Sequence, residues 1–106
     1  MASQKQVRRI AEMEACLDRL SPAMRDFSRA LEAFEAAQQD FRRLSDYYGS
    51  TQWMTDYEAD EAGKLPAELK RGVLSEDTVY DLISEYRDLG GRMLRLVSRA
   101  LDKNLL

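Results

Sequence analysis

The residues best able to do chemistry lie in the middle of the chain, where carboxylates come just before basic side chains. The acids are Asp56, Glu58, Asp60 and Glu61, and the bases are Lys64, Lys70 and Arg71. Asp56 and Asp60 stand four residues apart, so a helix would place both on one face. Hard cations prefer oxygen ligands, and one hypothesis is therefore a metal or phosphate site built on Asp56 and Asp60.

Aromatic residues beside these charges support a second hypothesis. Trp53 and Tyr57 would share a helical face, and Lys70 and Arg71 follow soon after. Tryptophan, tyrosine and arginine are the residue types that dominate interface energetics. We therefore predict Trp53, Tyr57, Lys70 and Arg71 as contacts for a protein partner of unknown identity. A third interpretation, which ordinary packing favours, is that the aromatics anchor this segment to the rest of the fold while the charges pair or cap locally.

Ordinary catalytic machinery is scarce in this sequence. The chain has no histidine and a single cysteine, Cys16, which we expect to be buried and inert beside apolar residues. Gly63-Lys64 lacks the glycine spacing of a phosphate-binding loop. We assign no catalytic residue, expect no cofactor and lean against an enzyme. The alternative function is a metal-dependent phosphate or nucleotide-binding enzyme that uses clustered carboxylates.

The charge balance and hydropathy narrow the class of partner. The 106 residues include 16 basic and 19 acidic side chains, and a nucleic-acid binder would carry a basic excess. No run approaches the ~18 apolar residues of a membrane span, and the polar start does not resemble a secretory signal. We expect a cytoplasmic protein that binds neither nucleic acid nor membrane.

An apolar stripe predicts the element before the charged segment, a helix over about 4–48. Its members are spaced alternately three and four apart, with Gln38 as the polar interruption: Ile10, Met13, Leu17, Leu20, Met24, Phe27, Leu31, Phe34 and Phe41. This spacing keeps one helical face against a partner, as in coiled coils. Pro22 lies inside it and predicts a kink or a break. Because the spacing stays in phase from Leu20 to Met24, we favour one kinked helix.

Turn and cap signals divide the rest of the chain. Gly49 ends the first helix in a left-handed cap, and Ser50 or Thr51 begins a short helix over about 51–62. Residues 63–74 form a turn, and Ser75 caps a last helix over about 76–104. That helix repeats the stripe: Val79, Leu82, Tyr86, Leu89, Met93, Leu96 and Ala100. Gly90-Gly91 within it marks a place where another backbone could cross closely.

These elements predict an all-α single domain over residues 1–106. Two long amphipathic helices pack antiparallel, with coiled-coil-like contacts and a short helical connector. The first helix, about 45 residues and ~68 Å long, exceeds the last, which spans ~44 Å. The uncovered apolar face is then closed by a fold-back at Pro22 or by a second copy, so we expect a homodimer as one outcome.

The central segment also resembles a known family. The residues that carry the resemblance run from Tyr47-Tyr48-Gly49-Ser50 through Trp53-Met54 and 56–66 to 69–77 and Tyr80-Asp81-Leu82. They are similar to a small bacterial family, domain of unknown function 4298. The resemblance implies a bacterial, mainly helical domain and carries over no catalytic residues. We therefore expect a protein-interaction or structural module.

Overall fold

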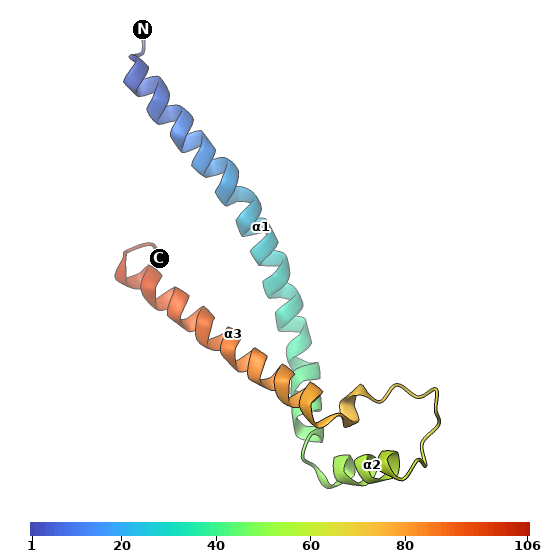
Figure 1. The fold of residues 1–106 in the computed structure, drawn as a ribbon. Helices are drawn as coiled ribbons and strands as arrows, with labels where there is room; N and C mark the ends of the chain where they lie inside the picture. Colours follow the sequence, from blue (N-terminus) through green and yellow to red (C-terminus); the bar gives the residue numbers. More distant parts are fainter. The chain divides into compact units, whose positions relative to one another are not determined.

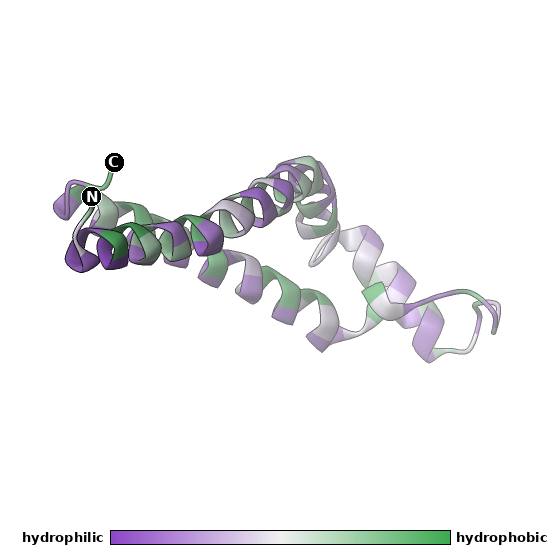
Figure 2. Ribbon diagram, turned by 90° about the horizontal axis from the view of Figure 1, so that it is seen from above, coloured by the Kyte–Doolittle hydropathy of each residue, from purple (hydrophilic) through white to green (hydrophobic).

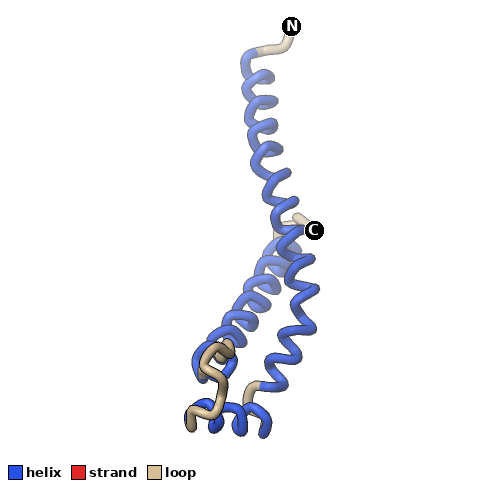
Figure 3. The backbone as a smooth tube through the Cα atoms, turned by 90° about the vertical axis from the view of Figure 1, so that its right-hand side faces the viewer, coloured by secondary structure: helices blue, strands red, loops and turns tan.

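The computed structural model describes residues 1–106 and contains helices, turns and no strand (Figure 3). Helix α1 covers Gln4–Tyr47, α2 covers Thr51–Glu61, and α3 covers Glu76–Asp102 (Figure 1). A short 3-10 helix, η1, covers Gly72–Leu74 just before α3. The all-α class is therefore confirmed. None of the helices combines the length and apolar character needed to cross a membrane.

The chain forms two compact units, Met1–Gln38 and Gln39–Leu106, with the boundary inside α1. The first unit is the N-terminal part of that helix. The Ser3 hydroxyl accepts a hydrogen bond from the Gln6 amide at 3.1 Å, which satisfies one of the free donors of the first turn. The helix continues through Pro22, so the alternative of a break there is excluded.

An apolar face of the first unit is open to solvent. Its seven residues each leave more than half of their surface exposed, and we call them the N-terminal apolar face: Val7, Ile10, Met13, Leu17, Leu20, Met24 and Phe27. Apolar and polar residues alternate along the helices in Figure 2, as the spacing predicts. Cys16 is exposed, so the expectation of a buried thiol was wrong. It flanks this same uncovered face.

The second unit begins with the turn between α1 and α2. Gly49 has φ +84°, the left-handed conformation predicted for it, which glycine adopts without steric cost. Ser50 then caps α2, and its hydroxyl oxygen accepts a hydrogen bond from the Trp53 amide at 3.1 Å. The helix ends at a second left-handed glycine, Gly63. There the Lys64 amide donates to the Ala59 carbonyl at 2.9 Å, as in a Schellman motif.

A small core holds the second unit together. Its three buried residues come from α2, η1 and α3: Trp53, Leu74 and Val79. The short helix η1 contacts both α2 and α3, so it joins them. At the start of the unit, the rings of Phe41 and Tyr86 stack at 3.7 Å between centroids and 12° between planes. Residues from the end of α1 and from α3 thus meet through their apolar stripes.

The glycine pair of α3 does not mark a close backbone crossing. A methyl group at Gly90 would meet nothing within 4 Å, and one at Gly91 would meet only the side chain of Arg95. Ser75 is the N-cap residue of the helix, as predicted, although its hydroxyl makes no capping bond. The helix ends in a capping motif, because Asn104 takes φ +57° and the Leu105 amide donates to the Ala100 carbonyl at 2.8 Å.

Candidate functional site

Trp53 lies at the centre of the predicted site, and it is buried. Only 6% of its surface is exposed. The ring stacks on Tyr57 at 5.2 Å and meets the edge of Tyr48 at 5.4 Å. Its indole Nε1 donates a hydrogen bond to the Val73 carbonyl oxygen at 2.9 Å. Burial with a paired N–H is the usual state of a structural tryptophan, so this side chain anchors α2 to the segment before α3.

Tyr57 covers the outer side of that indole. The four-residue spacing from Trp53 places the rings nearly parallel, at 17°, while the Tyr57 side chain stays partly exposed. The carboxylates of Glu61 and Glu76 raise the pKa of its hydroxyl, because they repel a second negative charge. Tyr57 therefore presents a neutral hydroxyl and a ring edge beside two acids.

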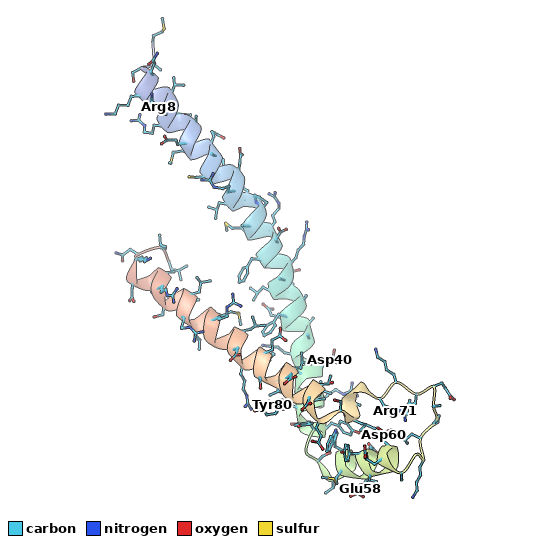
Figure 4. The ribbon with its side chains drawn as sticks, viewed as in Figure 1. Arg8, Asp40, Glu58, Asp60, Arg71 and Tyr80 are labelled. Atoms are coloured by element: carbon cyan, nitrogen blue, oxygen red, sulfur yellow. The ribbon has the colours of Figure 1, made fainter.

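Arg71 is held by a partner within its own unit. Its guanidinium donates to the Asp60 carboxylate at 2.7 Å, and the two side chains are 34% and 25% exposed. Figure 4 shows Arg71, which directly precedes η1, directed toward Asp60 on α2. This ion pair joins α2 to the returning chain on the same side as the indole hydrogen bond. Part of each charged group remains accessible to solvent.

Lys70 is exposed beside a shallow hollow of about 430 Å³. The hollow is mostly apolar, and its lining comes from the end of α1, from η1 and the residues just before it, and from the first turns of α3: Leu44, Lys70, Gly72, Val73, Thr78, Val79 and Leu82. An apolar floor with one ammonium group at its edge suits a partner's apolar side chain that lies next to a carboxylate.

The two candidate metal ligands are engaged separately. Asp56 accepts a hydrogen bond from the Tyr47 hydroxyl at 2.6 Å, and Asp60 pairs with Arg71. The bond to Asp56, together with partial desolvation, raises the pKa of Tyr47 to about 12. No group of three or more acidic, cysteine or histidine side chains lies close enough together to hold a metal ion. Here the two carboxylates serve as acceptors that tie α2 to other parts of its unit.

The site contains partners that sequence reasoning did not identify. The Tyr47 hydroxyl pairs with Asp56, and the Tyr48 hydroxyl donates to the Glu76 carbonyl oxygen at 3.1 Å. Both tyrosines stand at the end of α1, next to the glycine that reverses the chain. Two consecutive tyrosines before Gly49 could have indicated these contacts, because a ring at such a chain reversal can pack on either following helix. The Val73 carbonyl gave no such signal, since a backbone acceptor leaves no trace in side-chain pattern.

Comparison with known proteins identifies a family for this chain. No curated protein and no solved structure matches the chain. The model of a family described as Domain of unknown function (DUF4298) matches residues 10–96, which include the apolar stripe, the connector and most of α3. The chain therefore belongs to the DUF4298 family, as the resemblance of its central segment predicted.

Proposed function

We propose that this chain is a cytoplasmic bacterial module that works by binding protein, and that the N-terminal apolar face is its principal contact surface. The observation that carries the proposal is the exposure of that face. Leu17 leaves 54% of its surface in contact with solvent and Met24 leaves 62%. A contiguous row of large exposed apolar side chains is the usual mark of a protein–protein contact.

The proposal includes an antiparallel pairing of the two long helices, with coiled-coil-like contacts and a bend at Pro22, in one domain. The stacking of Phe41 on Tyr86 supports this pairing, because it joins the apolar stripes of α1 and α3 within the second unit.

The N-terminal apolar face belongs to the first unit, where each of its seven side chains leaves more than half of its surface exposed. Such a surface is stabilised by contact with another protein chain, which supports a binding or structural role over an isolated monomeric one.

The connector contributes a second, more polar part of the proposed surface. Tyr57, Lys70 and Arg71 keep exposed atoms there, whereas Trp53 is buried and stacks on Tyr57. The hollow beside Lys70 gives this part an apolar floor. The carboxylate hypothesis is less well supported, because a cation at Asp56 and Asp60 would have to displace the Tyr47 hydroxyl and Arg71.

Site-specific photo-crosslinking in bacterial cells tests this function. A photoreactive phenylalanine replaces Leu17 on the apolar face in one variant and Arg29, on the opposite side of the same helix, in the other. We expect protein adducts from position 17 and few from position 29, because close contact is needed for the reaction. Equal yields at the two positions, or no adduct at either, would contradict the proposed contact surface.

A further inference from the structure

We infer that a second copy of this chain covers the N-terminal apolar face from Val7 to Met24, with the two α1 helices parallel and in register. The inference rests on the proposed function and names the partner of the N-terminal apolar face. In heptad terms Ile10, Leu17 and Met24 occupy the a positions, and Met13 and Leu20 occupy the d positions. Each residue would meet its own copy, giving five consecutive apolar layers.

Charges beside this seam favour the parallel direction. Arg9 lies at a g position and Glu14 at the following e position. Five residues apart, the two side chains do not face each other on one helix. In a parallel in-register pair, a g residue lies opposite the next e residue of the partner helix. Arg9 of each copy would then meet Glu14 of the other, and the twofold symmetry makes two such pairs.

The remaining e and g positions allow the two helices to approach closely. Cys16 and Ala23 at g, and Ser21 at e, are small and uncharged, so no like charges oppose each other across the seam. Pro22 occupies the f position, on the side of the helix away from the seam, and its ring leaves the layers continuous. An antiparallel pair would instead bring g positions together and leave Arg9 and Glu14 without opposite charges.

The available area predicts a reversible dimer. The six side chains each expose more than half of their surface. At roughly 100 Å² apiece, two copies would bury on the order of 1,200 Å², which is the lower limit for specific interfaces. A surface of this size is enough for self-association that depends on protein concentration, and too small for a pair that never separates.

Sedimentation equilibrium of the full chain over a range of concentrations tests whether the partner is a second copy. We expect the parent to shift from monomer to dimer as concentration rises. Leu17→Asp should remain a monomer, because it places two carboxylates in one apolar layer. Leu94→Asp is the matched control, since Leu94 is 74% exposed on α3 and lies off its apolar stripe, and it should still dimerise. Circular dichroism confirms that each variant is helical.

Charge reversal tests whether the two α1 helices are parallel. Glu14→Arg should weaken the dimer by about three- to tenfold, because it replaces two opposite-charge pairs beside the seam with two like-charge pairs. Adding Arg9→Glu to it should restore the parental dissociation constant, because the pairs are again of opposite charge. A parent that stays monomeric overturns the inference, as does a dimer unaffected by Leu17→Asp or by Glu14→Arg. If the purified chain is monomeric while position 17 still crosslinks to a different protein in cells, the proposed function stands and the second copy is excluded.

Discussion

The indole nitrogen of Trp53 donates a hydrogen bond to the backbone carbonyl of Val73, 20 residues further along the chain, at 2.9 Å. This bond joins α2 to η1 and closes the loop between them. Arg71 and Asp60 form an ion pair across the same loop. The connector is thus a cross-linked unit with one buried ring, that of Trp53.

Trp53→Ala should destabilise the second unit by about 3 to 5 kcal/mol, because it removes a large buried side chain and leaves a cavity. Trp53→Phe retains a ring for stacking on Tyr57 and loses the hydrogen bond, so we expect a smaller cost of about 1 kcal/mol. Urea denaturation followed by circular dichroism measures both. Met54→Ala is the neighbouring control, since that side chain is 49% exposed and should change stability little. Equal losses from Trp53→Ala and Met54→Ala would show that the indole does not anchor α2.

Local signals predicted the elements of this chain well because capping chemistry is itself local. Gly49 adopts the left-handed conformation expected at a helix end, and Ser50 caps the next helix through its hydroxyl. The four-residue spacing of Trp53 and Tyr57 likewise produces the stacked rings. Each of these features depends on residues within one turn of each other, so no knowledge of the tertiary fold was needed.

Features that depend on distant residues were not predictable in the same way. Trp53 as a type suggests either a core or a contact surface, and only the position of the Val73 carbonyl and of Tyr48 shows that it is buried. Cys16 lies beside apolar residues, which suggested burial, yet burial also requires a surface that packs on the side chain, and Cys16 is exposed. Sequence pattern gives the face of a helix and not what covers it.

The ion pair between Arg71 and Asp60 should contribute about 0 to 1 kcal/mol, because both side chains are partly exposed and water screens them. A double-mutant cycle with Arg71→Ala and Asp60→Asn measures the coupling. We expect the coupling to shrink in 1 M salt, where the Debye length is about 3 Å. Lys70→Ala serves as the control for loss of a nearby positive charge. Coupling that is independent of salt would mean that the pair acts through packing and not through charge.

The hydrogen bond from Tyr47 to Asp56 should make stability depend on pH in the alkaline range. The pKa of Tyr47 rises from its ordinary value of 10.0 to about 12 in the folded chain. A raised folded pKa gives a stabilising contribution that is complete below pH 10 and is lost as pH rises toward 12. The free energy of unfolding of the parent should therefore fall toward that of Tyr47→Phe over this window. Tyr80→Phe, at an exposed position on α3, is the control. A difference between the parent and Tyr47→Phe that stays constant from pH 9 to 12 would contradict the assignment.

Replacing each of two glycines with alanine should change the free energy of unfolding in opposite directions. Gly49 has φ +84°, a conformation that costs other residues roughly 1 to 2 kcal/mol, so Gly49→Ala should destabilise the fold by about that amount. Gly90 is inside α3, where a methyl group would meet nothing within 4 Å. Alanine is the better helix former by about 1 kcal/mol, so Gly90→Ala should raise the free energy of unfolding. Thermal denaturation of both variants beside the parent gives the two signs. Destabilisation by Gly90→Ala would show that another helix packs closely against that point of α3, and would place a further contact surface there.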